Sequence, residues 1–377
     1  MKLYENINSD VLTWAITRAG YELHEFQERV PDVIDWIEGR KKPTLKQLEN
    51  FSKKVYLPFG YLFLKNPPVE KLPIPFFRTD GTETKKVSLN VYDTILLLQK
   101  RQDWLKNYLI ENDFEKLPYV GKFKNNKNIK AIVKDIRSEL GLNENWASDF
   151  NTWEDALGFL VGTIENKGII TVFNSVVENN TRRPIKVEEC RGFVLVDEIA
   201  PFMFINNADG KAAQMFTIAH EVAHIWTGHT AGFDFRKLQP AGNPVEKLCD
   251  RIAAELLVPE NLFNRTWNSY GNIKGLAKYF KVSEIVIARR ALDLNKITRK
   301  QFYDFYEKYK NSVLYKKEKK SPGGDFYATA KKRLGTTFAI HINQAVKSGK
   351  LLYRDAYKLT GLKGDTFENF FSVHLFK

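Results

Sequence analysis

The run MFTIAHEVAHIWTGH, at residues 215–229, constrains the fold more than any other stretch of this chain. It places His220, Glu221 and His224 in the spacing His-Glu-x-x-His, and the residues around them are mostly apolar. On an α-helix, residues i and i+4 lie on one face, so both imidazoles can face one ion while Glu221 lies one residue round. The pattern therefore predicts a buried helix that carries a polar site.

This spacing of two imidazoles predicts a Zn²⁺ site. Zn²⁺ binds imidazole nitrogen and, in catalytic sites, keeps one coordination position open for water. Glu221 is then expected to act as the general base toward that water, and the expected reaction is hydrolysis of a peptide bond. The alternative is a core helix that buries two hydrogen-bonded histidines, but with only 6 histidines in 377 residues a chance match is rare. The chain is therefore predicted to bind one Zn²⁺.

A third protein ligand is expected within VEKLCDRIAAELLVPE, at residues 245–260. Glu246 and Asp250 are four residues apart, which puts both on one face of a predicted helix. Glu246 would complete a site of two histidines and one glutamate. Asp250 would lie behind it and accept the second N–H of a ligand imidazole, which fixes the tautomer of the ring. The alternative is an ordinary surface helix with both carboxylates in water.

His229 is the other nearby candidate ligand. The metzincin spacing requires Gly at 227 and His at 230, where this chain has Thr227 and Thr230, so that arrangement is rejected. If the helix continues past His224, His229 lies roughly 140° round it from that residue. A side chain that stabilises the oxyanion is expected, but the sequence assigns no residue to this role.

The motif helix and the following E-x-x-C-D-x-I-A-A-E-L-L-V-P resemble the ImmA/IrrE family of metallopeptidases. The specific resemblance covers about residues 186–260 and includes RGFVLVDEIAPFMFINN before the motif. It implies a gluzincin-type peptidase domain in which Glu246 is the third ligand and Asp250 occupies the family's Asn/Asp position.

Hydrophobic periodicity and composition predict an α+β fold with a helical N-terminal domain, a peptidase domain and a helical C-terminal region. The peptidase domain is expected to hold a small sheet and the active-site helix. Helices are predicted at 88–112, 130–165, 212–227, 245–257 and 271–310, and strands at 168–173, 192–196 and 201–206. The last fifty residues are predicted to form three short helices.

Composition shifts divide the chain into domains. The predicted domains are 1–66, which resembles an Xre-like helix-turn-helix, a proline-rich linker at 67–87, the peptidase domain at 88–315, and a basic helical region at 325–377. Residues 271–294 resemble a second helix-turn-helix inside the peptidase domain. The stretch KKEKKSPGG, at 316–324, is a linker by composition.

The residues Asp197-Glu198-Ile199-Ala200 separate the last two predicted strands, which indicates a hairpin. The second strand holds Phe202, Met203, Phe204 and Ile205. These four residues are predicted to form an edge strand that pairs with an extended peptide substrate.

Cysteine content and hydropathy predict the compartment. Only Cys190 and Cys249 are present, which excludes a disulfide framework and a cysteine-rich zinc site and is typical of a reducing cytoplasm. No apolar run reaches about 18 residues, so no membrane span is expected. The first residues, MKLYENINSDV, have acids where a signal peptide is apolar. A soluble, cytoplasmic protein without a membrane partner is therefore predicted.

Positive charge is concentrated in the C-terminal part. The net charge is +13, and residues 300–363 hold 15 Lys/Arg against 5 Asp/Glu. Such a region is typical of nucleic-acid binding, of an acidic protein partner, or of a solvated surface. Arg289 and Arg290, on the second helix of 271–294, are candidate DNA contacts. The alternative is a helical pair that closes the peptidase core.

The stretch W-I-E-G-R-K-K-P-T-L-K-Q-L-E, at residues 36–49, carries the resemblance of the N-terminal domain to Xre-type proteins. In that fold, the third helix enters the major groove of DNA. Residues 22–38 hold six acids and one base, however, which should repel phosphates. Arg40, Lys41 and Lys42 are therefore candidate contacts to the DNA backbone alone, and docking to a protein is the competing role.

These features predict a zinc-dependent endopeptidase with a regulatory role. The expected substrate is a repressor or antitoxin-like protein, or a toxin partner, because the resemblance links such chains to mobile elements and toxin–antitoxin pairs. The alternative is a DNA-binding regulator or antitoxin component whose zinc domain is only a scaffold. Glu221 favours catalysis, since a scaffold does not need a general base. DNA stays open as a second partner.

Overall fold

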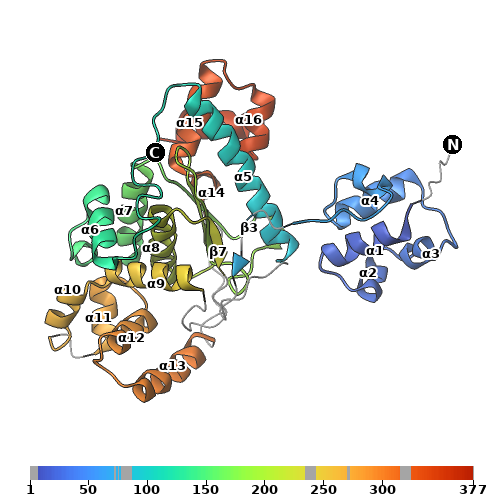
Figure 1. The fold of residues 1–377 in the computed structure, drawn as a ribbon. Coiled ribbons are helices and arrows are strands. Elements are labelled where there is room, and N and C mark those ends of the chain that lie inside the picture. The colour runs from blue at the N-terminus through green and yellow to red at the C-terminus, as the bar shows by residue number, and fades with distance from the viewer. Residues whose placement is uncertain are drawn as a thin grey trace. The chain divides into compact units, whose positions relative to one another are not determined.

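A computed structural model describes residues 7–71, 74, 76–77, 87–233, 243–269, 272–314 and 324–376. The chain divides into two compact units (Figure 1). The first comprises Met1–Pro73 with Lys85–Asp93, and the second comprises Ile74–Thr84 with Thr94–Lys377. The N-terminal region is helical, small sheets follow, and the C-terminal region is again helical. This arrangement confirms the predicted α+β class.

The N-terminal unit consists of short helices around one apolar core. Phe51 lies at its centre and makes edge contacts with the rings of Phe26 and Trp36. Thr44 and Gln47 form the capping box that begins the fourth helix. The helices are α1 (Ser9–Arg18), α2 (Leu23–Arg29), α3 (Val33–Ile37), α4 (Leu45–Lys54) and the 3-10 helix η1 (Phe59–Phe63).

A five-stranded sheet lies at the centre of the second unit, in the spatial order β1-β7-β5-β6-β2. Its strands are β1 (Phe76–Phe77), β2 (Ile170–Asn174), β5 (Gly192–Leu195), β6 (Phe202–Asn206) and β7 (Ala231–Phe233). β5 and β6 pair antiparallel, which confirms the predicted hairpin. β1 lies within the predicted linker of 67–87 and pairs parallel with β7. A separate antiparallel pair, β3 (Val176–Val177) and β4 (Asn180–Pro184), has no counterpart among the predicted strands.

β6 is an interior strand, so the prediction that Phe202, Met203, Phe204 and Ile205 form a substrate-binding edge is wrong. β5 pairs with one side of β6 and β2 pairs with the other, so its backbone groups are already used. All four side chains are buried. The continuous apolar run of β6 is typical of a central strand with both faces covered.

Helices precede, contain and follow the motif. They are α5 (Leu89–Ile110), α6 (Ile129–Leu140), the 3-10 helix η2 (Trp146–Asp149), α7 (Trp153–Glu165), α8 (Lys211–Thr227), α9 (Pro244–Leu257), α10 (Glu260–Thr266), α11 (Ile273–Phe280), α12 (Glu284–Asp293) and α13 (Arg299–Leu314). Of these, α7 and α8 pack against the sheet, and the motif helix α8 contacts β5, β6 and α9. Across the described ranges, no helix is both long enough and apolar enough to cross a membrane.

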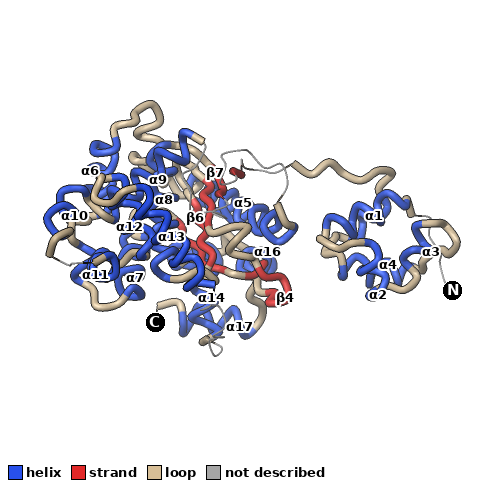
Figure 2. Tube along the Cα trace, turned by 90° about the horizontal axis from the view of Figure 1, so that it is seen from below, coloured by secondary structure: helices blue, strands red, loops and turns tan. Residues whose placement is uncertain are grey.

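Short helices form the C-terminal region of the chain. They are α14 (Phe326–Leu334), α15 (Thr336–Lys347), α16 (Tyr353–Thr360), α17 (Asp365–Asn369) and a π-helical turn, η3 (Phe370–His374). The predicted three helices are therefore too few. Gly335 and Gly361 end α14 and α16 with positive φ, which divides the apolar pattern into shorter elements. Of these helices, α14 and α15 pack against β2 of the sheet. Figure 2 labels α14, α16 and α17. The linker predicted at 316–324 lies almost wholly outside the described residues.

Candidate metal centre

The motif helix α8 is buried along most of its length. Its side chains from Gln214 to Thr227 are buried apart from Phe216, and those of His220, Glu221 and His224 are at most 1% exposed. Gly228 ends the helix in the left-handed conformation, with φ of 73°. The helix buries three ionisable groups because its apolar residues pack against both the sheet and α9. The predicted polar site in a buried helix is therefore present.

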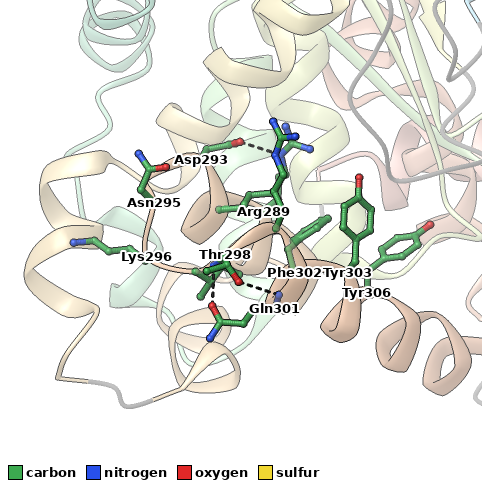
Figure 3. A pocket seen from close by; sticks show the side chains of 12 residues that line it. Arg289, Asp293, Asn295, Lys296, Thr298, Gln301, Phe302, Tyr303 and Tyr306 are labelled. Atoms are coloured by element: carbon green, nitrogen blue, oxygen red, sulfur yellow. Dashed lines mark hydrogen bonds and ion pairs between the residues drawn. The ribbon is translucent and has the colours of Figure 1, made fainter.

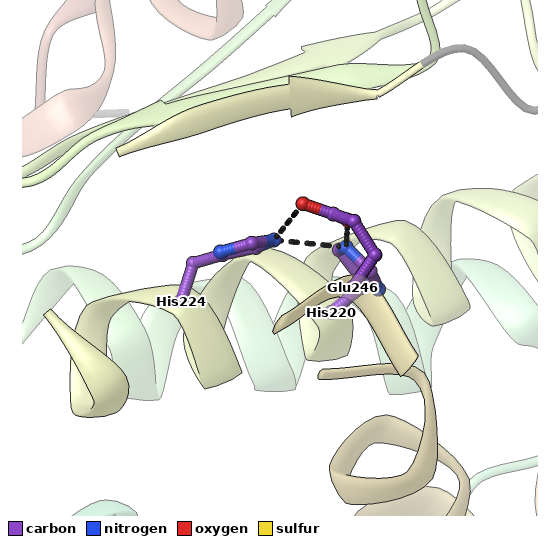
Figure 4. Close-up of side chains that lie close together, drawn as sticks. All are labelled: His220, His224 and Glu246. Carbon is purple, nitrogen blue, oxygen red and sulfur yellow. Dashed lines mark hydrogen bonds and ion pairs between the residues drawn. The ribbon is translucent and has the colours of Figure 1, made fainter. Parts of the chain in front are cut away.

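His220, His224 and Glu246 converge between α8 and α9 (Figure 4). The Nε2 atoms of the two imidazoles are 3.0 Å apart, and Oε2 of Glu246 is 3.0 Å from Nε2 of His220. Oε1 of Glu246 is 3.4 Å from Nε2 of His224. Asn243 and Pro244 begin α9 immediately before Glu246, so the helix start sets the position of this carboxylate. The structure thus brings the three predicted ligands together.

The chemistry of these donor atoms fits a metal ion. Two ring nitrogens that face each other can share only one proton, so a cation that accepts both lone pairs suits them better than a hydrogen bond. Two imidazoles and one carboxylate are the donor set typical of a catalytic Zn²⁺ site. Both carboxylate oxygens of Glu221 are buried and have no hydrogen-bond partner among the described residues, which is costly unless a ligand or water occupies the site.

Asp250 lies where the spacing on α9 predicts, behind His220. Its Oδ1 accepts a hydrogen bond of 2.9 Å from Nδ1 of His220, which leaves Nε2 of that ring to face the cluster. His224 has a different neighbour, the buried thiol of Cys249, which also lies 4.0 Å from Oγ1 of Thr227. Cys249 is not among the site residues predicted from the sequence, although it belongs to the E-x-x-C-D pattern of the family resemblance. Its place three residues after Glu246, on the same helix face, is the signal that indicates contact with the cluster.

The two buried glutamates of the site have opposite pKa shifts. Burial raises the pKa of Glu221 to about 7, although the nearby imidazoles of His220 and His224 act to lower it. Burial also acts to raise the pKa of Glu246, but the charge of His224 and the hydrogen bonds of both imidazoles outweigh burial and hold it below its ordinary value. Glu246 is therefore ionised, as a ligand must be, and Glu221 is able to gain and lose a proton near neutral pH.

Gly192 allows the sheet to approach the motif helix at Glu221. A Cβ atom at this position would lie 2.5 Å from Cγ2 of Thr217, 2.9 Å from the carbonyl oxygen of Phe204 and 3.2 Å from Oε1 of Glu221. Any side chain here would push β5 away from α8. Gly192 is not among the site residues predicted from the sequence, although a glycine at the start of a strand is a known sign of close backbone approach.

His229 follows the end of α8 instead of lying on a continuation of that helix. The helix ends at Thr227, and the N–H of His229 donates to the carbonyl of His224 at 3.1 Å. Burial and the charge of His224 lower the pKa of His229, while the charge of Glu246 acts to raise it. Its Nδ1 is buried and has no hydrogen-bond partner in the part of the chain that the structure describes.

The prediction that Arg290 contacts DNA is wrong. Arg290 is 9% exposed, donates to the carbonyl of Val258 at 3.0 Å and forms an ion pair with Glu255. Arg290 therefore connects α12 to the C-terminal end of α9. Arg289 is partly exposed and forms an ion pair of 3.0 Å with Asp293.

Arg40 and Lys41 are neutralised by neighbouring acids. Arg40 forms ion pairs with Asp35 and Glu38, and Lys41 lies 2.8 Å from Asp32. Lys42 is exposed. Acidic residues of 22–38 thus form ion pairs with two of the three cations that are predicted to contact DNA in this unit.

A pocket of about 720 Å³ lies between α12 and α13 (Figure 3). Arg289, Lys296 and Arg299 line it with the aromatic rings of Tyr303 and Tyr306. Lys296 and Arg299 are exposed, and neither is among the DNA contacts predicted from the sequence. Both lie inside 271–310, which is predicted to be helical throughout, whereas α12 ends at Asp293 and α13 begins at Arg299. Asn295, with φ of 55°, interrupts the helix between them and is the signal that could have identified this connection.

Comparison with known protein families agrees with this geometry. Residues 334–372 match a domain of unknown function, DUF8813. No match is found among curated proteins. Residues 165–292 match peptidase family M78, described as the IrrE N-terminal-like domain. This match runs from the end of α7 to α12, includes the whole candidate metal centre, and supports the ImmA/IrrE family of metallopeptidases for that part of the chain.

Proposed function

We propose that this chain is a zinc-dependent endopeptidase of the gluzincin type, with His220, His224 and Glu246 as ligands and Glu221 as general base. The observation that carries this proposal is the buried Glu221, which has no hydrogen-bond partner among the described residues and lies beside a cluster of two imidazoles and one carboxylate. A structural zinc site would not need a buried acid outside its ligand set.

The proposed reaction follows from these residues. When bound, Zn²⁺ would polarise the peptide carbonyl and lower the pKa of a water molecule. Glu221 takes a proton from that water as the water oxygen attacks the carbonyl carbon, and then gives the proton to the leaving amine. Asp250 holds His220 in the tautomer that leaves Nε2 unprotonated.

We further propose that the protease is regulatory and cytoplasmic. The resemblance of the N-terminal unit to Xre-type proteins favours a repressor, an antitoxin-like protein or a toxin partner as the substrate. Both cysteines are buried and neither forms a disulfide, which suits a reducing compartment.

The test compares new protein N-termini in cells that express the wild type, Glu221→Gln, or His24→Gln. The last variant is a matched control, because His24 is an exposed histidine of the N-terminal unit. Cleavage products are expected with the wild type and the control and not with Glu221→Gln. The same products from all three proteins would contradict the proposal.

The pocket between α12 and α13 favours a second candidate function, DNA binding. Arg289, Lys296 and Arg299 would contact phosphates, and the exposed ring of Tyr303 offers a stacking surface. In this case the chain would be a DNA-binding regulator or antitoxin component, with the zinc domain as a scaffold.

DNA binding is tested by the anisotropy of one labelled duplex at one low salt concentration. Lys296→Ala with Arg299→Ala is expected to weaken binding more than Lys41→Ala with Lys42→Ala, and to reduce the salt dependence by about two phosphate contacts. A larger loss from the Lys41 and Lys42 pair would assign binding to the N-terminal unit. Absence of binding by the wild type would exclude this second function.

A further inference from the structure

The residues assigned above leave one requirement of peptide hydrolysis unmet. As water adds to the peptide carbonyl, its oxygen gains negative charge, and preorganised donors aimed at that oxygen contribute strongly to catalysis. Glu221 handles the proton, and Asp250 accepts a hydrogen bond from His220. Neither side chain donates to the carbonyl oxygen, so a further donor beside the cluster is needed.

The backbone at the end of α8 holds His229 in one position. Gly228 adopts φ of 73°, and the N–H groups of Gly228 and His229 donate to carbonyls of the last helical turn. A Cβ at Gly228 would lie 3.0 Å from Cα of Gly121, so only glycine fits against this neighbouring segment. The N–H groups of Gly121 and Phe123 in turn donate to the carbonyls of Ile225 and Trp226, at 2.8 and 2.9 Å. The turn before His229 is therefore fixed from both sides.

The imidazole of His229 forms one hydrogen bond, with the backbone of Thr227. It does not belong to the group of ligand atoms formed by His220, His224 and Glu246. Its Nδ1 is buried without a hydrogen-bond partner among the described residues, and the charges of His224 and Glu246 act on the ring. An imidazole that is partly open to solvent and has one ring nitrogen without a hydrogen-bond partner in the described part of the chain is suited to meet a bound substrate.

We propose that His229 donates a hydrogen bond to the peptide carbonyl oxygen as that oxygen becomes negatively charged. This inference rests on the proposed peptidase function. In the first step the water oxygen bonds to the carbonyl carbon, the water proton moves to Glu221, and the π pair of the carbonyl moves to its oxygen. His229 keeps its proton and shares it with that oxygen. The pair then returns, the C–N bond breaks, and Glu221 gives its proton to the amine.

The test measures binding to the zinc-loaded full chain by calorimetry, with two probes. N-phosphoryl-Leu-Trp presents a tetrahedral anion, and acetohydroxamate binds the metal without one. His229→Ala is expected to weaken binding of the phosphoryl dipeptide by about 10- to 100-fold, the loss of one hydrogen bond to a charged group. Binding of acetohydroxamate should change by less than about twofold, and His229→Gln should recover part of the loss because its amide can donate.

Lys124→Ala is the matched control, because Lys124 is an exposed cation next to Gly228 whose charge also acts on His229. An unchanged affinity of His229→Ala for the phosphoryl dipeptide would overturn the inference. An equal loss in Lys124→Ala would do so too, since it would indicate general charge attraction. Loss of zinc from both His229 variants would make His229 a ligand instead. A wild type that holds no zinc, or binds neither probe, would refute the proposed function itself.

Discussion

Glu221 and Glu246 are the same residue type in one buried cluster, and their neighbours give them different chemistry. Glu246 lies within 3.4 Å of both imidazoles, so its charge is favoured despite complete burial. Glu221 has no hydrogen-bond donor among the described residues, so burial dominates and raises its pKa to about 7. Two acids whose environments separate their pKa values are typical of a ligand and a general base in one site.

We predict that a substitution at Glu221 lowers activity without loss of metal, whereas a substitution at Glu246 removes the metal. Glu221→Gln should keep zinc, because the ligand set is intact, and should lower peptide hydrolysis by about 10²-fold or more. Glu246→Ala should lose most of the zinc, because a catalytic site needs three protein ligands. Metal analysis of both purified variants measures their zinc content, and a peptide cleavage assay measures hydrolysis. Zinc loss from Glu221→Gln together with retention in Glu246→Ala would reverse the two roles.

A second prediction at the residue scale concerns Gly192. Gly192→Ala would place a Cβ 2.9 Å from the backbone oxygen of Phe204, which cannot rotate away. Overpacking of this kind costs about 1–3 kcal/mol of unfolding free energy and should shift β5 relative to Glu221. Gly158→Ala is the control, since Gly158 lies within α7 with nothing within 4 Å, and alanine should stabilise a helix interior there. Equal stability of the two variants by urea denaturation would contradict the contact.

At the scale of elements, α15 is connected to α7 by a buried carboxylate. The N–H of Thr336, in the first turn of α15, donates to Oε1 of Glu165 at 3.1 Å, and Glu165 is 9% exposed. A carboxylate suits the positive end of a helix. Burial still dominates here and raises the pKa of Glu165 to about 7. The helices that match the domain of unknown function are thus attached to the peptidase region through a group that titrates near neutral pH.

This attachment predicts a pH dependence of stability. In the unfolded chain Glu165 loses its proton near pH 4.5, whereas in the folded chain it does so near pH 7. Between these values the folded state binds more protons, so the free energy of unfolding falls as pH rises, by about 3 kcal/mol in total. Glu165→Gln should reduce the fall by this amount, while Glu139→Gln, a partly exposed acid of α6, should not. Glu221, whose pKa is also raised to about 7, contributes equally to both curves. Urea denaturation from pH 5 to pH 8 tests this, and parallel curves for wild type and Glu165→Gln would refute it.

At the scale of the whole second unit, Arg101 connects α5, early in the chain, to α14 and α16 near the C-terminus. Arg101 is 5% exposed, and its guanidinium donates to the carbonyls of Leu359 and Arg333, both at 2.9 Å. Burial lowers its pKa to about 10, so it remains charged at neutral pH. A cation at the C-terminal ends of α14 and α16 satisfies carbonyls that have no partner within their own helices.

We predict that Arg101→Leu loosens the C-terminal helices. One buried and one partly buried carbonyl would lose their donor, at a cost of about 2–5 kcal/mol. Amide hydrogen exchange should rise across α14 and α16 and stay unchanged in α8. Lys100→Leu is the matched control, because Lys100 is the exposed neighbour on the same helix. Uniform exchange changes across the unit, or none, would contradict this role.

The sequence by itself determined the local features of the site. His220, Glu221 and His224 share a helix face because of the 3.6-residue period, and the same period brings Glu246 and Asp250 together on α9. The β5–β6 hairpin is also local, since a short connection joins two adjacent runs. In each case the residues that decide the geometry are neighbours along the chain.

Only the tertiary structure decided features that depend on distant segments. β6 is interior because β2, which precedes it in the chain, pairs with the side that β5 leaves open. An apolar run has the same sequence pattern whether its strand lies at the edge of a sheet or in the centre. Arg290 is buried because Glu255 and Val258 of another helix accept its guanidinium. The turn at Gly228, which ends α8 just before His229, packs against Gly121 of a distant segment. Such contacts join residues with no fixed spacing, so no periodic pattern along the chain records them.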